Sequence, residues 1–292
     1  MKNPNLFIVG APKSGTTFLY YYLKQHPEIY FPDFKEPHFF GRDLIRRNDA
    51  YNLSLNEYQN LFETDKKIIG EASTFYLFSK TASEEIYNFN PQAKIIIMLR
   101  DLVDLAHSMH SQFVFSGDEL VENFSKALEL ENSRLNGDKI PSQTTVVNKL
   151  FYTSNILSLP ENIQSYINFF GRKNIKFIYL DDIQKNPRKV YSETLKFLNV
   201  DINFKISDFK IINKNKTYKS KIIRDFIKKY SILLGNLRSK IFRKPLGFIR
   251  TLEFMNKSEN KRDLMPENLR KKLTNQFSNV DFKIKKIINK KL

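Results

Sequence analysis

Residues 6–20 read LFIVGAPKSGTTFLY, an apolar segment followed by a tight turn and two threonines. The pattern predicts a strand over residues 6–10 and a helix that begins at Thr16 and Thr17. The first N–H groups of a helix have no partner within it, and the helix dipole adds partial positive charge. Together with the Lys13 ammonium, these groups predict a pocket for an anion, most naturally a phosphate.

The turn differs from the P-loop of nucleotide triphosphatases, which reads G-x-x-x-x-G-K-[ST]. Gly10 and Gly15 have the required spacing, but Thr16 stands where the lysine of that motif belongs. We also find no strand that ends in an aspartate suited to hold Mg²⁺. The turn is therefore expected to bind phosphate without hydrolysing a triphosphate. The alternative is an ordinary helix start that Ser14 or Thr16 only caps.

Strand and helix patterns alternate along the first 200 residues. Residues 94–99 form a continuous apolar run, which is typical of a parallel strand buried on both faces, and further strands are expected at 67–70 and 176–180. The helices are expected at residues 16–25, 55–62, 101–115, 120–135, 160–170 and 187–198, with a further helix that ends near Asn88. The alternation predicts an α/β fold, a P-loop-like arrangement of three layers with a central parallel sheet flanked by helices.

The carboxyl-terminal part of the chain is strongly basic. Residues 1–200 carry 23 Lys and Arg against 23 Asp and Glu, whereas the remaining 92 residues carry 25 against 8, which accounts for the net charge of +17. Residues 219–242 predict a basic amphipathic helix, or two helices broken near Gly235, and further helices are expected from Pro266 and from Phe282. We therefore divide the chain into a core, residues 1–204, and a basic helical extension, residues 205–292, packed on the same domain.

Composition sets further limits on the class of protein. The chain has no cysteine, which excludes disulfides, thiolate metal sites and a cysteine nucleophile. No signal peptide is visible, and no stretch approaches the ~20 apolar residues of a transmembrane helix. We therefore expect a cytoplasmic protein, peripheral to a membrane if its basic helices bind one.

Two motifs resemble the PAPS-dependent sulfotransferases, where PAPS is 3′-phosphoadenosine 5′-phosphosulfate. The first comprises PKSGTT at residues 12–17 and KEPHFF at residues 35–40, and the second is IIIMLRDLVDLAHS at residues 95–108. A weaker third block covers residues 175–200. The chain is most similar to the bacterial and carbohydrate-type branch of the family.

The resemblance implies roles for residues at both phosphates of PAPS. Lys13 would contact the 5′-phosphate and assist the leaving oxygen, and Ser14, Gly15, Thr16 and Thr17 would wrap that phosphate. Arg100 and Ser108 would bind the 3′-phosphate, the arginine through its fork of donors. Taken from the residues alone, Lys13 can be a solvated turn lysine, and Arg100 can pair with Asp101 or Asp104.

The candidate general base lies in the second half of the first motif. Glu36 matches the base of carbohydrate sulfotransferases, and partial burial would raise its pKa toward the working pH. His38 competes for the role, because cytosolic members of the family use a histidine. Each has a structural alternative: Glu36 can pair with Lys35 on the surface, and His38 can be a packed core residue. Glu71 matches a position near the acceptor in the family.

The resulting hypothesis is transfer of a sulfuryl group from PAPS to a hydroxyl, on a saccharide or a lipid-linked glycan, with PAP as product and no metal required. A P-loop-type kinase dependent on ATP and Mg²⁺ is the second hypothesis. The third is a basic module without catalysis that binds an anionic membrane or, less favoured, nucleic acid through residues 205–292.

Overall fold

The structure is a computed structural model of the 292-residue chain. It describes residues 3–47, 53–210, 217–238, 255–258 and 264–289.

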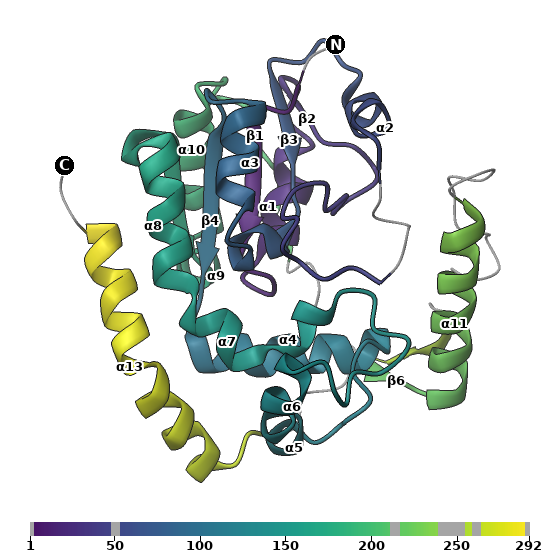
Figure 1. Ribbon diagram of the computed structural model, residues 1–292. Helices are drawn as coiled ribbons and strands as arrows, with labels where there is room; N and C mark the ends of the chain where they lie inside the picture. Colours follow the sequence, from purple (N-terminus) through teal and green to yellow (C-terminus); the bar gives the residue numbers. More distant parts are fainter. Residues whose placement is uncertain (1–2, 48–52, 211–216, 239–254, 259–263, 290–292) are drawn as a thin grey trace.

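A parallel sheet of five strands lies at the centre of the molecule (Figure 1). The strands are β1 (Leu6–Gly10), β2 (Ile29–Tyr30), β3 (Ile68–Glu71), β4 (Lys94–Leu99) and β5 (Ile175–Tyr179). Their order is β2-β3-β1-β4-β5, so the phosphate turn after β1 and Arg100 after β4 leave neighbouring strands at the same edge of the sheet. This arrangement confirms the predicted fold class.

Helices cover both faces of the sheet because the side chains of each strand alternate between two apolar layers. Phe7 and Val9 of β1 join one buried cluster with α3, α4, α7 and α8, whereas Leu6 and Ile8 join another with α1, α9 and α10. The bounds are α1 (Thr16–Leu23), α3 (Ala82–Phe89), α4 (Leu102–Ser116), α7 (Tyr152–Leu157), α8 (Leu159–Phe170), α9 (Leu180–Lys185) and α10 (Pro187–Leu198).

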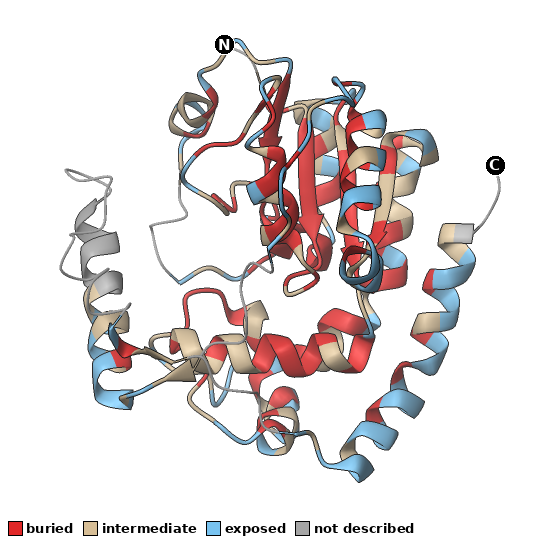
Figure 2. Cartoon of the chain, turned by 180° about the vertical axis from the view of Figure 1, so that it is seen from behind, coloured by how far each residue is buried: buried red, intermediate tan, exposed pale blue. Residues whose placement is uncertain are grey.

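Helix α4 passes the carboxyl ends of the strands and forms one wall of the site. It begins after Asp101, whose side chain caps the helix by accepting a hydrogen bond from the amide of Asp104 at 2.8 Å. The helix is buried along most of its length (Figure 2). Its register places Ser108 two turns beyond Arg100.

The basic region contributes two described helices, α11 (Lys221–Arg238) and α13 (Glu267–Asn289), and a short antiparallel pair, β6 (Thr217–Tyr218) with β7 (Lys257–Ser258). Helix α13 buries four apolar side chains in the same cluster as the core and turns its other face to solvent (Figure 2). These side chains are Leu273, Phe277, Val280 and Ile284. Arg224 of α11 donates to the carbonyl of Val114 at 3.1 Å, at the end of α4. The boundary at residue 204 stays a prediction.

Several element predictions are wrong in detail. The single helix expected at 120–135 is two helices, α5 (Phe124–Glu129) and α6 (Glu131–Leu135). Helix α5 starts later than expected because the Asn123 side chain caps it by accepting from the amide of Lys126 at 3.0 Å. The predicted helix at 55–62 is α2 (Leu55–Gln59) followed by a 3-10 turn. Helix α11 continues through Gly235, and α13 is one helix where two were expected. Residues 239–242 lie outside the described residues.

Candidate functional site

The phosphate turn presents unpaired polar groups at the start of α1. Lys13 (φ 62°) and Gly15 (φ 89°) take left-handed backbone conformations that turn the chain sharply into the helix. No side chain of the described residues caps α1. The Ser14 hydroxyl is fully buried and has no hydrogen-bond partner among the described residues. These donors fit an anionic ligand, because a buried polar group without a partner is otherwise costly.

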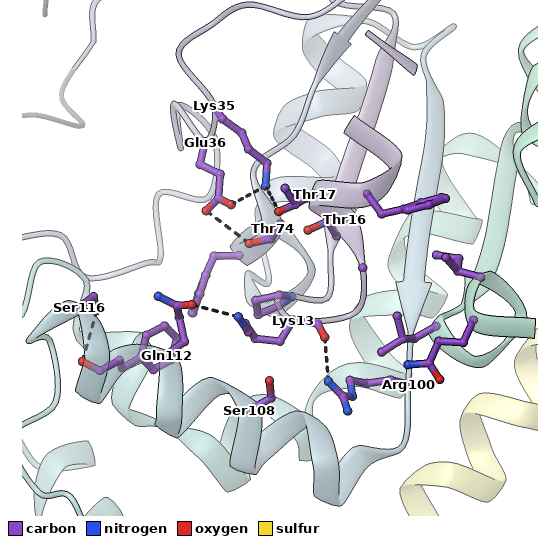
Figure 3. Close-up of a pocket in the computed structure, with 18 of the residues that line it drawn as sticks. Lys13, Thr16, Thr17, Lys35, Glu36, Thr74, Arg100, Ser108, Gln112 and Ser116 are labelled. Atoms are coloured by element: carbon purple, nitrogen blue, oxygen red, sulfur yellow. Dashed lines mark hydrogen bonds and ion pairs between the residues drawn. The ribbon is translucent and has the colours of Figure 1, made fainter. Parts of the chain in front are cut away.

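A cavity of about 720 Å³ opens between this turn, α4 and the loop that contains Glu36 (Figure 3). Seven of the nine predicted site residues line it: Lys13, Gly15, Thr16, Thr17, Glu36, Arg100 and Ser108. Ser14 and His38 do not line it and are 0% and 5% exposed. The structure therefore brings together residues that lie up to 95 positions apart in the sequence.

Arg100 contacts the backbone of the phosphate turn, whereas the Lys13 ammonium contacts Gln112 of α4. The Lys13 Nζ donates to Oε1 of Gln112 at 3.0 Å, and Nη1 of Arg100 donates to the carbonyl of Lys13 at 3.0 Å (Figure 3). Nη2 of Arg100 is 3.8 Å from Oδ2 of Asp104, which is the ion pair that the structural alternative named. Ser108 extends toward the same part of the cavity (Figure 3). The fork of Arg100 is thus held in place while its guanidinium still faces the cavity.

Glu36 lies at the opposite side of the cavity from Arg100, beside a second lysine (Figure 3). Its carboxylate is 3.3 Å from Lys35 Nζ and 3.3 Å from His38 Nε2, and Thr74 Oγ1 donates to it at 3.4 Å. Lys35 also donates to the Thr17 hydroxyl at 3.1 Å. Lys35 therefore connects the phosphate turn with the candidate base.

The charge states of this group differ from the sequence expectation. Burial raises the pKa of Glu36, but the hydrogen bond with His38 and the charge of Lys35 outweigh it and lower the pKa to about 2. The expectation of a raised pKa is therefore wrong. Burial lowers the pKa of His38 despite its contact with Glu36, so the imidazole is neutral near pH 7. Glu36 is ionised but weakly basic, and a change in its contacts with Lys35 or His38 would strengthen it.

A buried ion-pair cluster forms another part of the cavity wall. Asp118 is 1% exposed and receives Lys149 at 3.0 Å and Lys228 of α11 at 2.8 Å. Although burial opposes it, the charges of these two lysines hold the pKa of Asp118 well below its usual range. Asp118, Lys149 and Ser116 all line the cavity. The cluster thus fixes the end of α4 against residues that are distant in the sequence.

Sequence reasoning missed several cavity residues. Gln112 lies one turn beyond Ser108 on α4, so helical spacing alone could have indicated it. Lys35 was considered only as a surface partner of Glu36, whereas it is part of the cavity wall. Lys149 and Phe209 come from segments without a motif, and no local signal marks them. Among the described residues, no group of three or more His, Asp or Glu side chains is placed to hold a metal ion.

The chain belongs to the sulfotransferase family. The family model described as "Sulfotransferase domain" matches residues 3–245. This match confirms the predicted family.

Named relatives agree with the family. Mouse carbohydrate sulfotransferase 15 is 27% identical over 248 residues, which cover 68% of this chain and 44% of the relative. The membrane-associated sulfotransferase kil1 of Dictyostelium discoideum is 36% identical over 126 residues, covering 43% of this chain and 26% of the relative. The chain thus spans less than half the length of these two relatives. The crystal structure of a sulfotransferase from Alicyclobacillus acidocaldarius superposes with a TM-score of 0.64 at 29% identity, covering 86% of this chain and 100% of that one.

The predicted cytoplasmic location is wrong as a conclusion from the sequence. One relative is named as a membrane-associated sulfotransferase. None of the helices in the described part of the chain is long and apolar enough to cross a membrane.

Proposed function

We propose that the cavity binds PAPS and transfers its sulfuryl group to a hydroxyl of a saccharide. The observation that carries the proposal is the convergence of three groups on one cavity: the phosphate turn with Lys13, the Arg100–Ser108 pair, and the Glu36 carboxylate. The Arg100 side chain and the start of α1 offer two separate sites for anions, as a donor with phosphates at both ends of its nucleoside requires.

The proposed reaction needs charge neutralisation and one proton transfer. The acceptor oxygen forms a bond to sulfur while the bond between sulfur and the bridging phosphate oxygen breaks, and PAP leaves with the electron pair. Lys13 and the amides at the start of α1 would stabilise the charge that grows on the leaving oxygen. Glu36 would take the proton of the acceptor hydroxyl. His38, which is buried and neutral, would hold the Glu36 carboxylate rather than act as the base.

The acceptor class rests on the relatives. Their printed names include "Carbohydrate sulfotransferase 15" and "Bifunctional heparan sulfate N-deacetylase/N-sulfotransferase 3". We propose a saccharide or a glycan-bearing molecule, including a lipid-linked glycan, as the acceptor of this chain. Family likeness does not select among such acceptors, because acceptor contacts come from variable loops.

The predicted contact of the basic helices with an anionic membrane stays a prediction. Helix α11 exposes Ile222 (82%) and Phe226 (52%), which is typical of a docking face. However, Arg224 and Lys228 of the same helix are directed inward and paired with α4 and Asp118. These two basic side chains therefore bind groups of the protein itself and are not directed to solvent.

Two variants test the proposed function. Lys13→Ala should weaken PAP binding by about tenfold or more, because it removes a charged donor from the phosphate site. Glu36→Gln should keep PAP affinity and lose transfer from radiolabelled PAPS to a saccharide panel that includes desulfated heparan sulfate. The matched controls are the exposed residues Lys126→Ala and Glu84→Gln. Full PAP affinity and full transfer rate in both site variants would contradict the proposal.

A further inference from the structure

Glu71 is a buried carboxyl that the cavity does not include. It ends β3, is 1% exposed and does not line the cavity. Its Oε2 accepts a hydrogen bond from the Tyr58 hydroxyl at 3.3 Å, whereas its Oε1 is buried and has no hydrogen-bond partner among the described residues. Burying a carboxyl oxygen without a hydrogen-bond partner costs free energy of folding, so a functional reason for this residue is worth seeking.

The side chains that surround Glu71 hold the loop that carries Glu36. The hydroxyls of Ser73 and Tyr76 favour the ionised form of the Glu71 carboxyl and so oppose the rise of its pKa. The Ser73 hydroxyl also accepts from the amide of His38 at 3.0 Å, and the Tyr76 hydroxyl accepts from the amide of Phe40 at 3.2 Å. Two electrostatic neighbours of Glu71 thus bind backbone amides of residues 36–40.

A third neighbour of Glu71 supports the same loop by packing. The ring of Tyr58, whose hydroxyl donates to Glu71, stacks on the ring of Phe39 with centroids 4.2 Å apart and an interplanar angle of 11°. Tyr58 lies in α2, Ser73 follows β3 and Tyr76 belongs to the next 3-10 turn. Three separate parts of the fold therefore lie next to Glu71 and also contact the loop of residues 36–40.

The loop needs such support because its backbone is strained. Glu36 has φ 61° and His38 has φ 49°, in the left-handed region that residues with a side chain rarely occupy. Residues in these conformations persist when the surrounding structure over-determines them, and they gather at functional sites. In this loop, the two strained residues are the candidate base and its histidine neighbour.

The charge of Glu71 is coupled to that of the candidate base. Burial raises the pKa of Glu71 to about 7, the hydrogen bonds from Ser73, Tyr76 and Tyr58 oppose this, and the charge of Glu36 adds to it. Near neutral pH a large share of Glu71 is therefore protonated. The neutral carboxyl avoids repulsion from the Glu36 carboxylate.

We propose that Glu71 is a positioning residue for sulfuryl transfer: through Ser73, Tyr76 and Tyr58 it fixes residues 36–40 so that the Glu36 carboxylate faces the cavity. The role of Glu36 as base rests on the function proposed above. The anchoring of the loop does not, and it can be measured without an acceptor.

Hydrogen exchange of the backbone amides tests the anchoring directly. Glu71→Ala should speed exchange at His38 and Phe40 on the order of tenfold, the loss expected for one hydrogen bond, whereas Glu71→Gln should restore most of the protection. The matched control is Glu131→Gln, a buried glutamate that accepts from the amides of Thr153 and Ser154 at 2.8 and 2.7 Å, outside the cavity lining. Unchanged exchange in Glu71→Ala would overturn the proposal.

Kinetics with radiolabelled PAPS and desulfated heparan sulfate or another accepted saccharide provide the second measurement. Glu71→Ala should lower kcat by about tenfold to a hundredfold while the PAP affinity and the acceptor KM change little, and Glu71→Gln should recover kcat. A loss of kcat that parallels a loss of PAP affinity, or no loss of kcat, would overturn the positioning role. If wild-type protein transfers nothing to any saccharide, the proposed function fails while the exchange result still decides the anchoring. If Glu71→Ala does not fold, Ser73→Ala makes the same test, because it removes the link to the His38 amide.

Discussion

Glu71→Gln is expected to change how the free energy of unfolding depends on pH. The pKa of Glu71 is about 7 in the folded protein against 4.5 for an ordinary glutamate. Between these values the folded state binds more protons than the unfolded state, so stability falls as pH rises through the window and the loss is complete above pH 7. Glutamine does not titrate, and the variant should lack this slope.

The magnitude follows from the width of the window. Each unit of pKa difference corresponds to about 1.4 kcal/mol. The titration of Glu71 should therefore lower the free energy of unfolding of the wild-type protein by up to about 3 kcal/mol as the pH rises from 4.5 to above 7. Glu36 acts in a different window, because its lowered pKa contributes stability that is lost only as pH falls from 4.5 toward about 2. His38 is present in both proteins, so the comparison isolates Glu71.

Urea unfolding at several pH values from about 4.5 to about 8 measures the effect. The chain has no tryptophan, so far-ultraviolet circular dichroism is the suitable signal. The difference between the unfolding midpoints of Glu71→Gln and wild type should grow by roughly 1 M urea, in favour of the variant, as the pH rises from about 4.5 to about 8. The exposed control Glu84→Gln should follow wild type at every pH. A difference that is the same at both ends, or that grows toward low pH, would refute the assigned charge state.

Three further outcomes are expected. Lys13→Met should weaken PAP binding in calorimetry by about tenfold to a hundredfold without altering thermal unfolding, and equal affinity would count against its role. Arg134→Met leaves Glu119, its partner at 2.7 Å, buried without a counter-ion, and should lower the free energy of unfolding by about 3–5 kcal/mol in urea, whereas a loss below about 1 kcal/mol would contradict this. Gly10→Ala would place a Cβ against the carbonyl oxygen of Thr74, and the φ of Gly10, 139°, is one that residues with a side chain rarely adopt. The variant should therefore lower the free energy of unfolding by about 3 kcal/mol or more, and an unchanged free energy of unfolding would contradict this.

The parts of the fold that local patterns control were predictable. The run at residues 94–99 and the turn after residue 10 have strong strand and turn signals, and the structure places both as expected. The two-residue strand β2 was missed because Pro27 and Pro32 flank it and indicate a loop. Its pairing with β3 depends on tertiary contacts that no local pattern encodes.

The candidate site was predictable where a motif carries it and not elsewhere. Motifs placed Lys13 and Arg100, and both line the cavity. They did not indicate that Ser14 is fully buried or that Glu71 lies outside the cavity lining, because burial depends on how separate elements pack. The raised pKa expected for Glu36 was wrong for the same reason: His38 turns back to contact it.

A crystal structure of the protein soaked with PAP tests the account of the donor site most directly. We predict the 5′-phosphate against residues 12–17, in contact with Lys13 and the first amides of α1, and the 3′-phosphate at Arg100 and Ser108. The nucleotide would then leave the Glu36 side of the cavity open to an acceptor. PAP bound elsewhere, or an empty cavity at saturating PAP, would contradict the account.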